Sequence, residues 1–494
     1  MRITIIRWLI IISGFLLIAG CRGTVQVGIE RTSTPNRSIP ATLAALQDEN
    51  HRLATRVAER TETPPARLEL GQLAYVQGGD IWIMPLLDDA VSPQRLTTDG
   101  YNREPHWSAS GKWLAYRKER ESALIGPPAT VQGNDLTTAR HQVWVIQSDG
   151  NADHPLNQGL SVESCAWSPS GERLAYTTAG GGLYIINADG TGLVTLIAPD
   201  TSVTLSERQI GQIAWSPTGH SIAYEWRVQP ISRPAVSQDL RVISIEGGAP
   251  LELVNARVST ESEATLVGWS ALGDEVLFVQ DPSSVDAPID GGRLSAVRVE
   301  PLVPGTSQIR AIEYGAVLPY ADVVVPIPAA AASPEGEDLA YVVGQGRRTW
   351  TDKRLKTTSH FITGDDLAVM SPAWSPTGDR LAFAAMPDRN ELSTNELTAL
   401  LPRRIYLANA VGDPQLRALT NSNAYRDERP LWSSGGDYLL FARFDARGRA
   451  SLWLIPSGGG VPRQVVDELT PAPEPYESFG LVSWSTYYDW WRGP

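Results

Sequence analysis

The sequence predicts an all-β fold in which a small antiparallel unit is repeated around a closed ring. One motif occurs six times: an apolar strand ending in tryptophan, a tight turn with serine and glycine, and a returning apolar strand. The copies are almost evenly spaced along the chain, which is typical of repeat architectures. In addition, the first unit lacks a strand that the end of the chain can supply.

The motif is clearest between Ile213 and Tyr224. A first strand ends at Trp215, residues 216–219 (Ser-Pro-Thr-Gly) predict a type I turn, and a second strand returns through residues 222–224. Proline fixes φ at the second turn position, and glycine relaxes the fourth. The other copies begin at Trp107, Trp167, Trp269, Trp374 and Trp432.

The spacing of the copies predicts the number of units. Successive motif tryptophans lie 48 to 60 residues apart, except for one gap of 105 residues, which is about two periods. A worn copy lies inside that gap: Ser-Pro-Glu-Gly at 333–336 precedes Leu-Ala-Tyr at 339–341, with Ala332 in place of tryptophan. We therefore expect eight units, with seven as the alternative if residues 300–360 do not form one.

The two ends of the chain predict how the ring closes. Residues 73–76, 81–84 and 94–97 have the pattern of the second to fourth strands of a unit without a first strand. Trp484 follows Trp432 by 52 residues, but no turn or second strand follows it. We therefore expect the C-terminal strand around Trp484 to complete the N-terminal unit.

This pattern resembles the TolB-type, WD-repeat-like β-propellers. The resemblance rests on the Trp-Ser-Pro-x-Gly hairpin, on third strands such as residues 183–190, and on the closing pair Leu419 and Thr420. It implies a β-propeller over residues 66–486. We expect the aromatic tail at 487–494 to pack across the closure, with contact to lipid or a partner as the alternative. Propellers host unrelated activities, so the fold alone does not specify a function. In TolB-type propellers the central opening is a partner site, and the resemblance implies the same role here.

The N-terminus has the pattern of a lipoprotein signal peptide at residues 1–20. Two arginines precede a short apolar run, and Ile-Ala-Gly-Cys at 18–21 resembles a bacterial lipobox. We expect cleavage before Cys21 and lipidation of its thiol, which would anchor the protein to a membrane. The predicted location is therefore extracytoplasmic, in a periplasm or on the outer cell surface.

Two segments precede the propeller. Residues 21–40 are rich in Thr, Ser, Arg and Pro and predict a flexible tether. Residues 41–61 predict a helix with a heptad seam, made of Leu43, Leu46, Asn50, Leu53 and Val57. Because fewer than three heptads are marginal alone, a solitary amphipathic helix is favoured. A short coiled coil that forms a dimer through residues 43–57 is the alternative.

Charge and cysteine content narrow the classes of partner. The formal net charge is −13, with acidic and basic residues mixed along the chain, which argues against a nucleic-acid surface. Cys21 is assigned to lipidation, so Cys165 has no disulfide partner within the mature chain. Its place two residues before Trp167, in a predicted inner strand, favours a small buried hydrophobe over a nucleophile.

Length variation is concentrated in the loops between second and third strands. The long loops are residues 118–140, 227–238, 281–292 and 386–404. In a propeller these loops share a face with the links that enter each first strand, whereas the Ser-Pro-x-Gly turns lie on the opposite face. This arrangement is expected where a partner is bound and loops are free to diverge. Loop divergence without function is the alternative.

The links into the first strands place polar groups near the predicted channel mouth. These residues are Arg103, Glu104, Glu163, Gln212, Arg426, Asp427, Glu428 and Arg429. A mixed polar ring of this kind suits a protein or peptide segment that enters the mouth. A solvated funnel without specific contacts is the alternative.

The sequence carries none of the common catalytic motifs. It has no nucleophile elbow, zinc-protease helix, phosphate-binding loop or calcium loop, and its six histidines show no ligand spacing. We therefore expect no cofactor and no metal. The repeats are also similar to the propeller half of prolyl-oligopeptidase-like enzymes, whose catalytic triad lies in a separate domain that we do not expect here.

The function that fits these features is non-catalytic binding of a protein or peptide at the cell envelope. Two other classes stay open. One is a hydrolase or lyase that acts on envelope glycans or peptides, with paired carboxylates at the mouth. The other is a scaffold subunit of an envelope complex, which a dimerising helix would support.

Overall fold

The structure, a computed structural model, describes most of the predicted propeller. Residues 69–494 form one compact unit. The predicted signal peptide, tether and helix lie outside the described residues, as do most residues of the long loops. No helix within the described part of the chain has the length and apolar character needed to cross a membrane. The described residues are 70–87, 91–119, 141–156, 162–178, 180–199, 208–228, 237–254, 262–282, 292–300, 309–317, 323–324, 338–344, 353–388, 401–471, 473 and 482–493.

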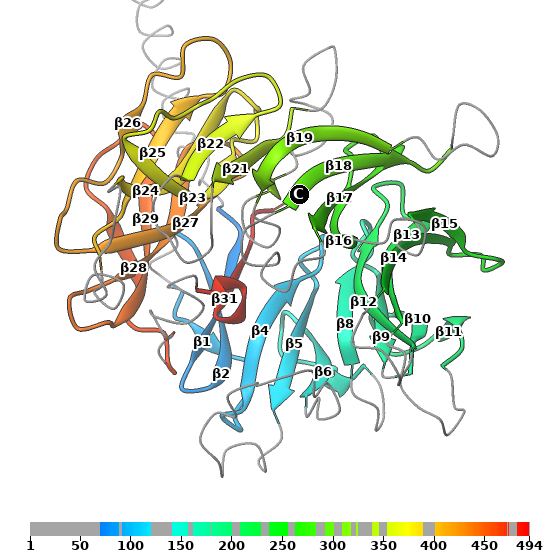
Figure 1. The fold of residues 1–494 in the computed structure, drawn as a ribbon. Helices are drawn as coiled ribbons and strands as arrows, with labels where there is room; N and C mark the ends of the chain where they lie inside the picture. Colours follow the sequence, from blue (N-terminus) through cyan, green and yellow to red (C-terminus); the bar gives the residue numbers. More distant parts are fainter. Residues whose placement is uncertain are drawn as a thin grey trace, which may run out of the picture. The chain divides into compact units, whose positions relative to one another are not determined.

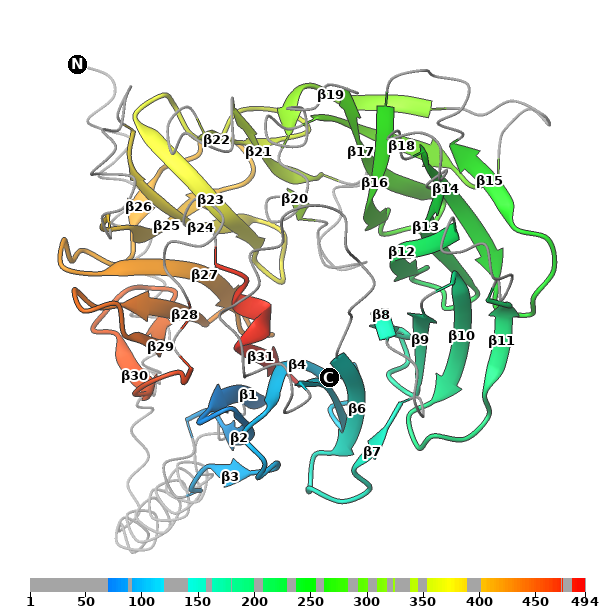
Figure 2. The same ribbon diagram turned by 60° about the horizontal axis from the view of Figure 1, so that its bottom comes forward.

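The described strands form seven antiparallel sheets that follow one another around a ring (Figures 1 and 2). The predicted all-β propeller is therefore confirmed. Sheet 1 contains β1 (Gln72–Gln77), β2 (Asp80–Pro85), β3 (Gln94–Arg95) and β31 (Tyr488–Trp491). Sheet 2 contains β4 (Asn102–Trp107), β5 (Trp113–Glu119), β6 (His141–Gln147) and β7 (His154–Pro155). Sheet 3 contains β8 (Val162–Trp167), β9 (Arg173–Thr178), β10 (Gly182–Asn187) and β11 (Val194–Ile197).

The remaining sheets complete the ring. Sheet 4 contains β12 (Arg208–Trp215), β13 (Ser221–Val228), β14 (Ser237–Ser244) and β15 (Leu251–Val254). Sheet 5 contains β16 (Ser262–Trp269), β17 (Glu275–Pro282), β18 (Gly292–Arg298), β19 (Ile309–Val317), β20 (Val323–Val324), β21 (Ala340–Gly344) and β22 (Lys353–Thr357). Sheet 6 contains β23 (Leu367–Trp374), β24 (Arg380–Pro387), β25 (Arg404–Asn409) and β26 (Arg417–Ala418). Sheet 7 contains β27 (Arg426–Trp432), β28 (Tyr438–Phe444), β29 (Ala450–Pro456) and β30 (Arg463–Val466).

The serine of each motif holds the turn that joins the first two strands of a sheet. Ser216 Oγ accepts a hydrogen bond of 3.1 Å from the backbone N–H of Ser221, and the N–H of Gly219 donates to the Ser216 carbonyl at 2.8 Å. Gly219 has φ of +71°, a left-handed conformation that favours glycine. The Oγ bond recurs in all six motifs, at Ser108, Ser168, Ser216, Ser270, Ser375 and Ser433.

The tryptophan of the motif joins one sheet to the next. Trp269 Nε1 donates to the carbonyl of Ala214, which directly precedes the motif tryptophan of sheet 4, at 3.0 Å. The same bond, also at 3.0 Å, is made by Trp167, Trp215 and Trp432. Within the described part of the chain, the Nε1 atoms of Trp107 and Trp374 have no such partner. The repeated motif is therefore an inter-sheet contact as well as a hairpin.

The expectation of eight units is wrong, and the seven-unit alternative is confirmed. The worn copy lies at β21, which pairs with β20 and β22 but also joins β19 through one residue pair, Val317 with Val343. Tyr341 of β21 packs with the core of β17 and β18, and Val342 packs with the core of sheet 6. These strands fill the place of the eighth copy without forming a sheet of their own.

Ring closure by the C-terminus is confirmed, but the strand is not the one around Trp484. The closing strand is β31, part of the predicted tail, and it pairs with β1 from Tyr75 opposite Tyr488 to Gln72 opposite Trp491. Trp484 instead begins a short 3-10 helix, η4 (Trp484–Thr486), and donates its indole N–H to Glu428. The Trp-Ser pair at 484–485 copies the motif in sequence but makes a different contact.

A comparison of two tryptophans tests the inter-sheet bond. Trp269→Phe removes the indole donor to the Ala214 carbonyl, whereas Trp374→Phe removes the same atoms without breaking such a bond. The two side chains are similarly buried, at 6% and 4% exposure. We expect Trp269→Phe to lower the free energy of unfolding by about 1 kcal/mol more than Trp374→Phe does. Urea denaturation checks this, and equal losses would show that the bond does not stabilise the ring.

Candidate functional site

The predicted mouth residues lie on four first strands, as expected, but in two different environments. Arg103 and Glu104 are on β4, Glu163 is on β8 and Gln212 is on β12. These four side chains are partly or fully exposed, and we call them the mouth group. The other four residues, 426–429, are on β27, where three of them are buried.

The buried residues of β27 form ion pairs inside the protein. Arg426, Asp427 and Glu428 are only 3%, 1% and 3% exposed. Asp427 accepts two hydrogen bonds from Arg443, of 2.6 and 2.9 Å, and the Arg443 guanidinium lies 4.6 Å from the Trp453 ring. The expectation that these three residues line an open mouth is therefore corrected, because they are buried in sheet 7.

Glu428 is the centre of this network. It pairs with Arg426 Nε at 2.5 Å and with Arg403, and it accepts the Trp484 indole N–H at 2.8 Å. Burial would raise the pKa of Glu428, but Arg426 and Arg403 outweigh it and hold the pKa below its usual range. Its contribution to stability is therefore present above the ordinary carboxyl pKa and is lost as the pH falls through the lowered value. Arg403 and Trp484 were not predicted, because no local pattern in the sequence connects them to Glu428.

Arg429 connects sheet 7 to the closing strand. Its Nη1 donates to the Tyr488 carbonyl at 3.0 Å, and its guanidinium lies 4.6 Å from the Tyr488 ring. Arg429 has φ of +47° and Glu104 has φ of +53°, and each lies in a register shift of its first strand. Such bulges re-aim a side chain at the cost of about 1 to 3 kcal/mol in backbone strain.

Two members of the mouth group already have partners on their own sheet. Arg103 Nε lies 3.3 Å from Glu119, and Glu104 lies 3.1 Å from Arg117 Nε. All four of these side chains remain between 21% and 30% exposed, so a ligand can reach them. Gln212, three residues before the motif tryptophan of sheet 4, is exposed.

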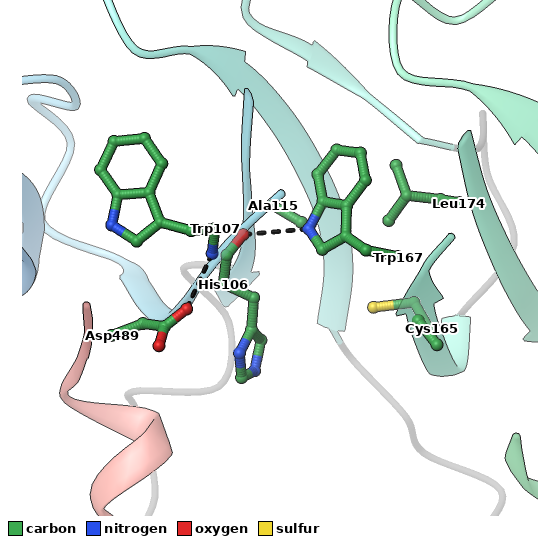
Figure 3. Close-up of a pocket in the computed structure, with 8 residues that line it drawn as sticks. His106, Trp107, Ala115, Cys165, Trp167, Leu174 and Asp489 are labelled. Atoms are coloured by element: carbon green, nitrogen blue, oxygen red, sulfur yellow. Dashed lines mark hydrogen bonds between the residues drawn. The ribbon is translucent and has the colours of Figure 1, made fainter. Parts of the chain in front are cut away.

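Two adjoining cavities of about 200 Å³ each lie between sheets 2 and 3. Figure 3 shows the first of them. His106, Ala115 and Cys165 line both of them. The first has both apolar and polar walls and is also lined by Trp107, Ala166, Trp167, Leu174 and Asp489. The second is charged and is also lined by Glu104, Tyr116, Arg117, Val143, Glu163 and Ser164. The structure thus brings Glu104 and Glu163, two residues of the mouth group, to one cavity.

The walls of the first cavity are fixed by hydrogen bonds. Trp167 Nε1 donates to the His106 carbonyl at 3.0 Å, and Asp489 of the closing strand accepts the backbone N–H of Trp107 at 2.9 Å (Figure 3). Burial raises the pKa of the Cys165 thiol to about 11, so the side chain is a neutral thiol at neutral pH. This agrees with a packing role for Cys165.

Glu163 differs from the other charged residues of these cavities. Among the described residues, no group forms a hydrogen bond or ion pair with its carboxylate. Burial raises its pKa, and the more distant Arg227 opposes that effect. Within the described ranges, no group of three or more His, Cys, Asp or Glu side chains is arranged to hold a metal ion.

A substitution in the β27 network tests whether these residues stabilise the fold. Glu428→Gln removes the carboxylate that Arg403 and Arg426 share, so we expect a loss of about 3 to 5 kcal/mol in the free energy of unfolding. Glu104→Gln removes a partly exposed pair with Arg117 and should cost less than about 1 kcal/mol. Urea denaturation of both variants at neutral pH gives the comparison. Similar small losses in both would contradict a buried network.

No protein-family model matches the chain, and the comparison with curated proteins finds no match. Solved structures with a similar fold include one from a study of two prolyl endopeptidases, with 12% identity and a TM-score of 0.47. That match covers 74% of this chain and 50% of the endopeptidase, so the chain spans about half of that protein. Oligogalacturonate lyase from Vibrio parahaemolyticus has 10% identity and a TM-score of 0.42, and the match covers 83% of this chain and 88% of the lyase.

TolB from Acinetobacter baumannii is also similar, with 13% identity and a TM-score of 0.31. The match covers 84% of this chain and 70% of TolB. At these identities the likeness concerns the fold. The chain is a β-propeller, and TolB proteins are among the structures similar to it, as the resemblance in the sequence implied.

Proposed function

We propose that this protein is a non-catalytic module that binds a protein or peptide segment at the mouth of the propeller. One observation carries the proposal: three consecutive first strands present accessible polar side chains of both signs beside two cavities. Arg103, Glu104, Glu163 and Gln212 supply donors and acceptors for a peptide backbone and its side chains. The buried ion pairs of sheet 7 support this role because they hold part of the ring in a fixed arrangement.

We further propose that the module is held at the cell envelope by a lipid on Cys21. The lipobox pattern at 18–21 supports this proposal. Two or more acyl chains would give stable membrane attachment, since each buried methylene contributes about 0.8 kcal/mol.

Fractionation of cells that express the full chain tests the anchor. We expect the unaltered protein in the membrane fraction and the Cys21→Ser variant outside it, because the variant has no thiol to acylate. As a control, circular dichroism should show the same folded propeller in both forms. Retention of Cys21→Ser in the membrane fraction would overturn lipid anchoring through this residue.

Capture from envelope extract tests the binding proposal. We expect the full chain to retain a specific protein, and the Arg103→Ala/Gln212→Ala variant to retain at least about tenfold less of it, because mouth contacts are lost. Lys112→Ala/Glu172→Ala is the matched control, since these exposed residues lie beside the Ser-Pro-x-Gly and Ser-Ala-Ser-Gly turns, away from the mouth group. Equal retention by all three forms would exclude the mouth group as the binding surface.

A hydrolase or lyase acting on envelope glycans or peptides is the second candidate. It is favoured by one observation: Glu104 and Glu163 line the same cavity, and burial raises the pKa of Glu163 as a general acid requires. Products formed from peptidoglycan fragments or peptides by the unaltered protein, but not by Glu163→Gln, would support this candidate over binding alone. The scaffold role depends on residues 43–57, which lie outside the described part of the chain.

A further inference from the structure

The charged cavity between sheets 2 and 3 contains one more negative charge than positive charge. Its ionisable walls include the carboxylates of Glu104 and Glu163 and the guanidinium of Arg117. Glu104 and Arg117 neutralise each other at 3.1 Å. The charge of Glu163 therefore has no counter-charge among the residues that line the cavity.

The cation that affects the pKa of Glu163, Arg227, already forms an ion pair with another carboxylate. Arg227, on β13 of sheet 4, opposes the rise in the Glu163 pKa that burial causes. However, Arg227 donates to Glu225 at 2.8 Å and to Gln238 at 3.1 Å. Glu225 is fully buried, so its carboxylate holds Arg227 in place. A half-buried carboxylate without its own counter-charge is costly, and a bound cation would relieve that cost.

The adjoining cavity supplies apolar surface for the stem of a basic side chain. Trp107, Trp167 and Leu174 line it, and it shares His106, Ala115 and Cys165 with the charged cavity. Its carboxylate, Asp489, already accepts the backbone N–H groups of Trp107 and Trp490. Lysine and arginine bury their methylene stems against apolar surfaces while the charged head meets a polar group. The faces of tryptophan rings also attract cations.

We propose that these two adjoining cavities together bind a basic side chain, the ammonium group of lysine or the guanidinium group of arginine, with Glu163 as its counter-charge. The stem packs between the tryptophans of β4 and β8. The cavity thereby selects a peptide with a basic residue at the position that reaches it. That the cation belongs to a peptide ligand rests on the proposed function. The cation site itself does not, because the cavity residues define it.

Small mimics of the two side chains test the site directly. Saturation-transfer NMR with the full chain measures binding of n-butylammonium and n-butylguanidinium, with n-butanol and butyrate as neutral and anionic controls. We expect at least one cation to bind, and Glu163→Gln to weaken it by about tenfold or more through loss of a charge-assisted contact. Glu172→Gln, an exposed residue of the same sheet, is the matched control and should leave the affinity unchanged.

The outcomes separate this inference from the proposed function. Failure of both cations to bind, equal binding of n-butanol, or equal affinity in Glu163→Gln would overturn the cation site, even if envelope capture succeeds. Binding of a cation that Glu163→Gln weakens would support the site, even if capture retains no protein. The Gln variant removes a half-buried charge without changing shape, so it should fold, and circular dichroism checks that it does.

Discussion

The ring depends on the hydrogen bond from a motif tryptophan to the carbonyl that precedes the tryptophan of the sheet before it. Neighbouring sheets meet mainly through side chains, so something must fix how each sheet lies on the next. An indole is suited to this task because it buries a large apolar surface and has one directed donor. The buried serine beside it holds the turn, so the indole leaves the backbone at the same place in every sheet.

Among the described residues, the bond is missing at the two places where the repeat itself is interrupted, and other contacts lie there. Before sheet 6, where Ala332 stands in the worn copy, β21 packs one face on each neighbouring core. At the closure, Trp491 Nε1 donates to the Ala109 carbonyl at 3.0 Å, and Asp489 accepts the N–H of Trp107. The closing strand thus carries its own tryptophan bond, displaced by a few residues from the position that the motif uses.

The sequence was sufficient to predict features that depend on local patterns, such as the hairpins, the turn glycines and the completion of the first sheet by the C-terminus. It misplaced the closing strand because residues 488–491 lack the motif that Trp484 partly imitates. It also misjudged Glu428, because charged residues beside a loop usually face water, and the matching Arg403 lies on another sheet. Likewise, the isolation of Glu163 depends on Arg227 being held by Glu225, which is a three-dimensional fact.

The number of sheets in this ring depends on a single residue pair. Val317 and Val343 are the only paired residues that link β19 to β21 in the described part of the chain. The other six sheets have four strands each. Without this one pair, β16–β19 and β20–β22 would be two sheets, and the number of sheets would be eight instead of seven. The number of sheets in this ring can therefore change at one strand edge, with no strand gained or lost.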